Sequence, residues 1–306
     1  MKISIIGAGN VGALSAMRIA QYNLGDIFLV DIAKGLAEGK SLDLADAQAV
    51  LGLDYNIRGS DDINSIRDSD IVVITAGLAR RPGMTREELL AKNSQILKEV
   101  CLNVKKLASQ AIVIVVTNPL DLMTYLALKI TGFAKNKVLG MGSSLDSSRF
   151  ANLIAQELKI AASSVEAMVI GAHGEGMLPL AKHTKIKGVS LEEFLNGDKM
   201  ESLTKRTINR GAEIVALLGS GSAFFAPSAA VAQMVRSITK DEKKIIGACA
   251  YLEGEYGIKG ICMGVPCRLG RGGIENIIEL DLTGQEQEEL SRSAYSIRTL
   301  LKQLSF

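Results

Sequence analysis

A histidine in a glycine-rich turn is the first candidate for acid–base chemistry. His173 lies in the run Gly171–Gly176, after an apolar stretch, and the chain has only one other histidine. Imidazole has a reference pKa of about 6.5, so this side chain could exchange a proton with a substrate at neutral pH. The other histidine, His183, lies in a basic stretch without this setting and is expected at the surface. A histidine in a turn is also often a bystander, and the spacing alone leaves that alternative open.

An acid and a base follow each other at helical spacing in the segment Ser144–Arg149. Asp146 and Arg149 are three residues apart and would share one face of a helix. On the surface they would form an ion pair worth under about 1 kcal/mol. If Asp146 is buried, Arg149 could instead clamp a carboxylate ligand with two hydrogen bonds. The sequence is compatible with both interpretations.

Residues 75–88 combine two glycines with up to three arginines. Thr85 and Glu88 fit a capping box, which predicts a helix that begins near Arg86. The residues before it would form a loop with the glycines as hinges. Such a loop could close over an anionic substrate and exclude water, or it could be a solvated basic loop that binds nothing. Its arginines are Arg80, Arg81 and Arg86.

An amide side chain follows the apolar run 113–116. Thr117 and Asn118 lie at the carboxyl end of this predicted strand. Ligands of open α/β sheets bind at that edge. Asn118 could therefore contact a bound ligand, or it could merely cap the next helix.

A glycine pattern near the start of the chain predicts a nucleotide site. The run Gly7–Gly12 has the spacing G-x-G-x-x-G between an apolar strand and an apolar helix. Gly7 would make the tight turn, Gly9 would let the backbone approach a pyrophosphate, and Gly12 would allow close helix–strand packing. Asp31 ends the second predicted strand, where a carboxylate accepts hydrogen bonds from adenosine ribose hydroxyls and repels a 2′-phosphate, which favours NAD over NADP. The alternative is a structural turn, with Asp31 as a helix-capping acid.

The elements that must position these residues alternate between short apolar runs and amphipathic stretches. This alternation is typical of βαβ units and predicts a parallel sheet covered by helices on both faces. The predicted strands are Ile3–Ile6, Ile27–Val30, Tyr55–Arg58, Ile71–Thr75, Ile112–Val116 and Val138–Leu139. The helices predicted between them include Ala13–Gln21, Leu36–Val50 and Glu87–Leu107.

The pattern changes after about Ser144. A helix over Leu145–Leu158 leads into a strand over Val165–Ile170, followed by a helical stretch at Lys199–Leu217 and a polar segment from Glu286 onward. No low-complexity linker separates the halves, which suits a shared cleft. We therefore expect an α/β fold in which a doubly wound Rossmann sheet, residues 1–143, precedes an α+β substrate and catalytic domain, residues 144–306.

The composition excludes several other classes of protein. The net charge of +2 is dispersed and aromatic residues make up only 4%, so no nucleic-acid surface is expected. No apolar run approaches the roughly 20 residues of a spanning helix, and without an export signal a cytoplasmic location is expected. The cysteines lack the spacing of a zinc site, so we expect no metal and reduced, buried thiols, with a Cys262–Cys267 disulfide as the alternative. They are Cys101, Cys249, Cys262 and Cys267.

Taken together, the segments around these motifs resemble the lactate/malate dehydrogenase family. They look most like its malate dehydrogenases of lactate-dehydrogenase-like type. The similarity covers almost the whole chain and extends to the tail around Gly264–Pro266 and Gly273–Leu280. The resemblance implies an NAD-dependent oxidoreductase that interconverts malate and oxaloacetate, a metabolic role in the tricarboxylic acid cycle, and a homodimer or homotetramer.

The resemblance also implies a role for each polar residue of the site. The histidine at the position of His173 exchanges the proton, the aspartate matching Asp146 orients it, and the arginine matching Arg149 binds the carboxylate beside the reacting carbon. The loop arginine matching Arg86 polarises the carbonyl. Lactate dehydrogenases carry glutamine at the position of Arg80, where malate dehydrogenases carry arginine. A carboxylate partner compensates the buried guanidinium and a methyl group does not, so Arg80 favours malate.

The cofactor and substrate contacts expected from the resemblance and the motifs form two sets. Asn118 would contact both the nicotinamide ribose and the substrate. The family's turn often reads Gly-Gly-His-Gly-Asp, whereas this chain has Glu175 and Gly176 after His173-Gly174, a departure that could alter the rate. Residues expected to bind NAD are Gly7, Ala8, Gly9, Asn10, Val11, Gly12, Asp31, Asn93, Thr117 and Asn118. Residues expected to bind substrate are Arg80, Arg86, Asn118 and Arg149.

Three alternatives to a malate dehydrogenase stay open at this point. A lactate dehydrogenase or another 2-hydroxy acid dehydrogenase would differ in substrate preference. An NAD-dependent glycosidase on a related fold would require a metal site with cysteine and histidine, and no cysteine lies near His173 in the sequence. A non-catalytic NAD-binding protein would be expected to lose the acid, the base or the carboxylate clamp.

Overall fold

Parallel strands form the first part of a large mixed sheet. The computed structural model describes residues 1–78 and 86–304, apart from the side chain of Arg86. Among these residues the strand order begins β3-β2-β1-β4-β5-β6, and each neighbouring pair runs parallel. The bounds are β1 (Lys2–Ile6), β2 (Asp26–Val30), β3 (Ile57–Ser60), β4 (Ile71–Ile74), β5 (Ile112–Val115) and β6 (Val138–Gly140).

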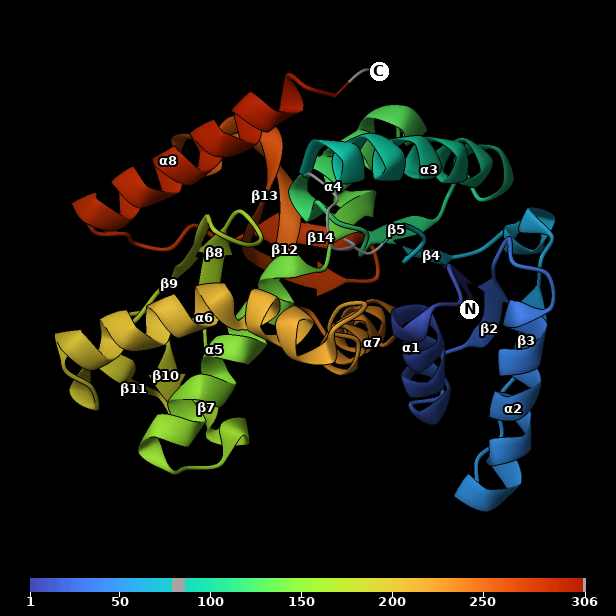
Figure 1. Cartoon of the computed structure of the whole chain (residues 1–306), viewed down its shortest axis with the longest axis horizontal. Helices are drawn as coiled ribbons and strands as arrows, with labels where there is room; N and C mark the ends of the chain where they lie inside the picture. The colour runs from blue at the N-terminus through green and yellow to red at the C-terminus, as the bar shows by residue number, and fades with distance from the viewer. Residues whose placement is uncertain (79–85, 305–306) are drawn as a thin grey trace.

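Helices cover both faces of this parallel half. α3 and α4 lie above the sheet in Figure 1, and α1 and α2 lie below it. β4 and β5 are buried along their whole length, which explains their unbroken Ile/Val sequences. The bounds are α1 (Asn10–Gln21), α2 (Leu36–Leu51), α3 (Arg86–Leu107) and α4 (Leu120–Thr131). The predicted doubly wound parallel sheet is confirmed.

The strand order has its topological switch point at β1: the chain continues to β2 on one side of β1, and β4 lies on the other side. Chain connections leave this point in opposite directions, so a crevice opens beyond the carboxyl ends of the two strands. Gly7 follows β1 and Thr75 follows β4, and the Thr75 hydroxyl donates to the Gly7 carbonyl at 2.8 Å. The glycine pattern therefore lies where this fold places ligands.

The second half of the chain extends the same sheet with antiparallel strands. β12 pairs antiparallel with β6, and the order continues β13-β8-β9, while β14 pairs with β13. A separate small sheet has the order β11-β10-β7. The strands are β7 (Val165–Glu166), β8 (Val169–Gly171), β9 (Met177–Pro179), β10 (Lys185–Ile186), β11 (Val189–Ser190), β12 (Lys244–Glu253), β13 (Lys259–Gly270) and β14 (Gly273–Ile277). The helices are α5 (Gly142–Leu158), α6 (Gly197–Leu218), α7 (Phe225–Thr239) and α8 (Gly284–Leu301).

The prediction of one strand over Val165–Ile170 is wrong. The structure divides this segment into β7 and β8, which belong to different sheets. Between β7 and β8, backbone N–H groups donate to side-chain hydroxyls and not to a neighbouring strand. The Met168 N–H donates to Thr184 Oγ1 at 3.1 Å, and the Val169 N–H donates to Ser147 Oγ at 3.0 Å. The ladder is therefore interrupted where the apolar pattern suggested continuity.

Two hydrophobic clusters form the core, and the larger one contains residues from both halves of the chain. The larger runs through the sheet and the helices on it, and a smaller one around Phe150 and Leu153 lies between α5, α6 and the small sheet. The four cysteines are buried free thiols, as predicted. Among the residues that the structure describes, no helix is both long and apolar enough to cross a bilayer.

Candidate active site

Two of the three glycines in the turn lie in close contact with other backbone atoms. Gly7 has φ +107°, and a Cβ there would lie 2.6 Å from the Ala76 nitrogen. A Cβ on Gly12 would overlap the Gly7 carbonyl oxygen. A Cβ on Gly9, in contrast, would meet nothing within 4 Å. The outer two glycines are thus required by the fold, while Gly9 leaves open space where another molecule could approach.

Asp31 braces the glycine turn from the end of β2. Its Oδ2 accepts a hydrogen bond from the Ala8 N–H at 2.6 Å, and its Oδ1 accepts one from the Ala33 N–H at 2.9 Å. The alternative of a helix-capping role for Asp31 is not observed, because α2 begins at Leu36 with Gly35 as its N-cap. Lys40 of α2 donates to the Ala8 carbonyl at 2.7 Å.

A cavity of about 380 Å³ lies beyond the carboxyl ends of the parallel strands. Its walls come from the glycine turn, from the segments after β4 and β5, and from α6 and the segment before α7. Both halves of the chain therefore contribute to one site. The lining residues are Gly9, Asn10, Val11, Gly12, Thr75, Gly77, Leu78, Leu89, Val116, Thr117, Asn118, Val215, Gly221, Ser222 and Phe224.

Six of the ten residues expected to bind the nucleotide line this cavity. Asn93 is fully buried and ties two wall segments together. Its side-chain oxygen accepts from the Leu78 N–H at 2.8 Å, and its amide nitrogen donates to the Asn118 carbonyl at 2.7 Å. A direct contact of Asn93 with a nucleotide stays a prediction.

Thr117 and Asn118 are neighbours in sequence but differ in burial. Thr117 is buried and its hydroxyl donates to the Ala76 carbonyl at 2.7 Å, which joins the ends of β4 and β5. Asn118 is exposed on the cavity wall. α4 has Pro119 as its N-cap and no side-chain cap hydrogen bond. The structure therefore does not support the capping alternative for Asn118.

The predicted acid, base and arginine of the second half form one cluster. His173 Nδ1 lies 2.8 Å from Asp146 Oδ2, and Arg149 Nη1 donates to Asp146 Oδ1 at 3.4 Å. The side chains of Asp146, Arg149 and His173 are 2%, 11% and 16% exposed, so this is no surface ion pair. Asp146 links an imidazole to a guanidinium inside the fold.

Burial and charge oppose each other in this cluster. Burial alone would lower the pKa of His173, but the charge and hydrogen bond of Asp146, with the charge of Asp121, raise it above its ordinary value despite the nearby Arg149 cation. Burial lowers the pKa of Arg149, opposed by Asp146 and reinforced by Arg210 of α6. The cluster thus favours an imidazolium.

Arg149 keeps hydrogen-bonding capacity for a ligand. Its buried Nε has no hydrogen-bond partner among the described residues. The helix α6 passes close by at Gly211, where a Cβ would lie 3.4 Å from Arg149 Nη1. A buried guanidinium with an unsatisfied donor suits an anion, because an unpaired buried donor is costly.

Asp121 joins the cluster from α4, and sequence reasoning missed it. It is 6% exposed, and its Oδ2 accepts a hydrogen bond from the His173 backbone N–H at 2.8 Å. Cys249 of β12 donates to its Oδ1 at 3.2 Å. The residue stands three positions after Asn118, so it connects the histidine turn to a segment that lines the cavity. A carboxylate in an apolar helical start, as in Leu120–Met123, is the signal that could have identified it.

Two predicted substrate residues cannot be placed in the same way. Arg80 lies outside the described residues, as does Thr85 of the predicted capping box. Arg86 is the first residue of α3, as predicted for the helix start, but its side chain lies outside the description. The roles expected for Arg80 and Arg86 stay predictions.

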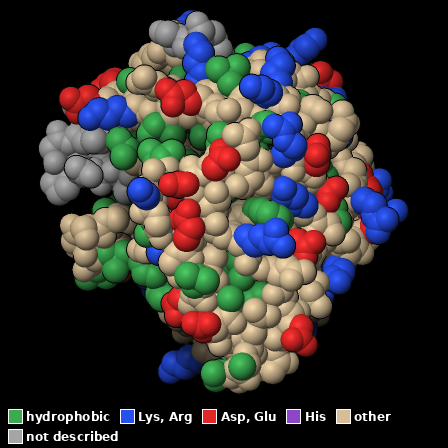
Figure 2. All heavy atoms as spheres, turned by 90° about the vertical axis from the view of Figure 1, so that its right-hand side faces the viewer, with side chains coloured by type: hydrophobic (Ala, Val, Ile, Leu, Met, Phe, Trp, Pro, Cys, Tyr) green, Lys and Arg blue, Asp and Glu red, His purple; other side chains and the backbone are tan. Residues whose placement is uncertain are grey.

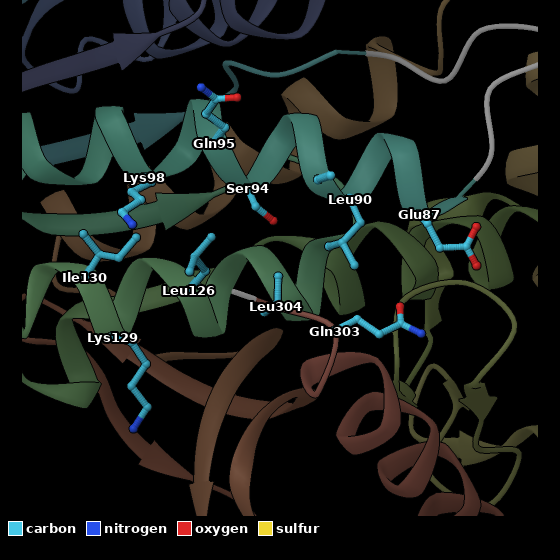
Figure 3. A pocket seen from close by; sticks show the side chains of 11 residues that line it. Glu87, Leu90, Ser94, Gln95, Lys98, Leu126, Lys129, Ile130, Gln303 and Leu304 are labelled. Carbon is cyan, nitrogen blue, oxygen red and sulfur yellow. The ribbon is translucent and has the colours of Figure 1, made fainter. Parts of the chain in front are cut away.

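A second and larger cavity, about 690 Å³, lies elsewhere. Figure 3 shows it between α3 and α4, beside the end of the chain at Gln303 and Leu304. Leu90, Leu126 and Ile130 contribute apolar walls. None of the predicted site residues lines it, and it does not lie at the strand ends where α/β sheets bind ligands. The smaller cavity is the candidate active site.

Comparisons with known proteins agree with this geometry. Models of the lactate/malate dehydrogenase NAD binding domain and alpha/beta C-terminal domain match residues 1–140 and 143–305. A malate dehydrogenase of Methanosarcina barkeri is 52% identical over 303 residues, 99% of each chain. The crystal structure of Cryptosporidium parvum malate dehydrogenase is 39% identical, with a TM-score of 0.96 over 98% of both chains. A C. parvum lactate dehydrogenase complexed with lactic acid and β-nicotinamide adenine dinucleotide is also 39% identical, with a TM-score of 0.94 over 99% of this chain and 98% of that one. This chain is a member of the lactate/malate dehydrogenase family.

Proposed function

We propose that this chain is an NAD-dependent malate dehydrogenase that interconverts (S)-malate and oxaloacetate. The observation that carries the proposal is the buried cluster of His173, Asp146 and Arg149 beside a cavity that contains the glycine turn. Curated relatives about half identical over the full length are malate dehydrogenases. The cluster supplies a proton-exchanging group and a carboxylate-binding group for a 2-hydroxy acid.

The residues of the cavity fit an NAD cofactor. Gly9 leaves the space that a pyrophosphate needs, and α1 begins at Asn10 with its first backbone N–H groups free of a side-chain cap. Asp31 presents a carboxylate beside the turn, which suits ribose hydroxyls and disfavours a 2′-phosphate. NAD supplies the hydride acceptor for malate oxidation, and NADH supplies the hydride donor for oxaloacetate reduction.

His173 is the group that we assign to proton transfer. Because Nδ1 faces Asp146, Nε2 is the nitrogen left for the substrate oxygen. Neutral His173 accepts the hydroxyl proton of malate, and protonated His173 returns it to the oxygen of oxaloacetate. Asp146 stabilises the imidazolium and fixes the ring, as a buried carboxylate does when it accepts from Nδ1–H.

Different arginines are assigned to the two carboxylates and to the carbonyl oxygen of the substrate. We assign Arg149 to the carboxylate beside the reacting carbon, which supplies the partner that its buried Nε lacks. From the family resemblance we assign Arg80 to the second carboxylate and Arg86 to the carbonyl oxygen. Asn118, exposed on the cavity wall, is assigned to the substrate and the nicotinamide ribose.

Lactate dehydrogenase activity is the rival function. A lactate dehydrogenase and a malate dehydrogenase of C. parvum are equally identical to this chain, so structural likeness does not choose between them. Oxidation of NADH should be followed by absorbance with oxaloacetate, with pyruvate and with neither acid. We expect turnover with oxaloacetate and little with pyruvate. A higher specificity constant for pyruvate would overturn the malate assignment, and equal rates with and without acid would overturn both.

We also infer a homodimer or homotetramer. Hydrophobic side chains are strongly exposed on α2, where Leu42 is 68% and Val50 is 89% exposed, and on α6, where Leu217 is 81% exposed. Figure 2 shows apolar side chains among mixed charges on the face that contains α2. These exposed apolar side chains, together with the family resemblance, support the inference. Light scattering of the purified protein should give two or four chain masses, and a single chain mass would contradict the inference.

The arrangement of the chain and its location complete the proposal. We place the boundary between the NAD-binding domain, residues 1–143, and the catalytic domain, residues 144–306. The ranges matched by the two family models support this division. The cytoplasmic location stays a prediction, which subcellular fractionation with a malate dehydrogenase assay would test.

A further inference from the structure

We propose that Asp121 is a positioning residue for the reaction, because its buried carboxylate fixes the backbone of His173 and places a second negative charge beside the imidazole. This inference rests on the proposed role of His173 in proton transfer. It goes beyond the pair of His173 and Asp146, since it assigns the histidine a second carboxylate, which comes from α4 while Asp146 comes from α5.

The geometry of Asp121 connects the two halves of the site. It is the second residue of α4 and is 6% exposed. Its Oδ2 accepts a hydrogen bond from the His173 N–H at 2.8 Å, and its Oδ1 accepts one from Cys249 Sγ at 3.2 Å. His173 and Cys249 belong to the turn after β8 and to β12. Asp121 therefore anchors the histidine main chain, while Asp146 holds the ring.

The contacts of Asp121 are those of an ionised carboxylate. Both oxygens face donors, and an ionised carboxylate only accepts. Burial raises the pKa of Asp121, while the His173 charge and the two hydrogen bonds oppose that shift and Asp146 reinforces it. Burial also raises the pKa of Cys249 well above its ordinary value, so the thiol keeps the proton that it donates.

In the described part of the chain, two carboxylates and one guanidinium act on the charge of His173. Asp146 is shared with Arg149, whose cation opposes protonation of His173, and Arg210 faces Arg149 from α6. Among the described residues, the other groups near the histidine are Asp121 and, beyond it, the neutral thiol of Cys249. Asp121 thus supplies negative charge that Arg149 does not neutralise directly. Without it, protonated His173 loses stabilisation.

Nuclear magnetic resonance titration of the two histidines tests this without any substrate. The protein carries labelled histidine, and His183→Asn assigns the two ring signals. Asp121→Asn removes the charge but keeps the size, and its amide oxygen can still accept the His173 N–H. We expect the pKa of His173 to fall by about one unit in this variant. The alkaline limb of oxaloacetate reduction should move to lower pH by the same amount.

Asp281→Asn is the matched control. Asp281 lies beside the other histidine, with its carboxylate 85% exposed and its carbonyl 2.7 Å from His183 Nε2. Because water screens an exposed charge, the control should leave the pKa of His173 where it is. Asp121→Glu keeps the charge with a longer side chain, and it should retain the raised pKa of His173 while lowering kcat by misplacing the turn.

The outcomes separate this inference from the proposed function. An unchanged pKa of His173 in Asp121→Asn would overturn the charge role. If Asp121→Asn does not fold, a pKa of His173 in Asp121→Glu that falls by the same one unit would overturn it as well. A wild-type protein that does not reduce oxaloacetate would overturn the proposed function, yet the two histidine titrations would still decide the role of Asp121.

Discussion

The glycine turn and the histidine cluster, the two parts of the candidate site, are built in different ways. The turn relies on main-chain groups from one short segment, with Asp31 as a nearby brace. The cluster relies on side-chain charges from α4, α5 and the turn after β8, which are far apart in the sequence. The shape of the turn depends on neighbouring residues and is therefore visible as a sequence motif. The arrangement of charges in the cluster depends on residues that only the fold brings together.

This difference predicts different responses to substitution. A change at Gly7 or Gly12 should alter packing first, because a Cβ at either position would meet backbone atoms. A change in the cluster should alter protonation and rate first, because its members are held by several elements at once. The four predictions below run from the largest expected effect to the smallest.

His173→Asn should give the largest effect, and it tests the charge side of the comparison. Asparagine cannot exchange a proton near neutral pH, so turnover should fall by about 10²–10⁴-fold. NADH binding should persist, because His173 does not line the cavity of the glycine turn. Steady-state kinetics measure the first effect and fluorescence titration with NADH the second. Near-normal turnover would remove His173 from the mechanism.

Arg80→Gln tests substrate choice. Loss of the guanidinium leaves the second carboxylate of oxaloacetate unpaired, while a methyl group is no longer penalised. We expect the ratio of kcat/KM for oxaloacetate over pyruvate to fall by about 100-fold or more. The same assay on both acids measures it, with Arg81→Gln as the neighbouring control. An unchanged ratio would refute the role of Arg80.

A comparison of Gly12→Ala with Gly9→Ala tests which glycines of the turn are required by the fold. A Cβ at position 12 would overlap the Gly7 carbonyl, whereas one at position 9 meets no protein atom within 4 Å. Overpacking should cost Gly12→Ala about 3 kcal/mol of unfolding free energy or more. Gly9→Ala should unfold like the wild type but bind NADH more weakly. Denaturant unfolding and NADH titration distinguish them, and equal losses of stability would contradict the division.

The pH dependence gives the smallest effect and follows from the raised pKa of His173. Oxaloacetate reduction needs the imidazolium, so kcat/KM should be highest below that pKa and fall about tenfold per pH unit above it. Malate oxidation needs neutral imidazole and should rise over the same range. The stabilisation that the imidazolium gives the fold is likewise present at low pH and lost as pH rises through the folded-state pKa. Rates that fall together with rising pH would contradict this assignment.

Local patterns predicted much of this molecule. The parallel strands, the start of α3 at Arg86 and the positions of Asp146, Arg149 and His173 follow from apolar runs and short motifs. β12 and β13 were not predicted, because their apolar sequences carry no helix alternation to place them. Asp121 was missed because its partners, His173 and Cys249, lie 52 and 128 residues away. Burial of an acid becomes meaningful only when such partners are known.

The brace at Asp31 has a consequence for cofactor engineering. The residue that we expect to exclude a 2′-phosphate also accepts a hydrogen bond from the Ala8 amide, while Lys40 donates one to the Ala8 carbonyl. Replacing Asp31 with alanine to admit NADP would free both peptide amides that it now secures, Ala8 and Ala33. A redesign toward the phosphorylated dinucleotide therefore needs a neutral acceptor such as serine or asparagine at this position, so that the specificity changes and the loop keeps its shape.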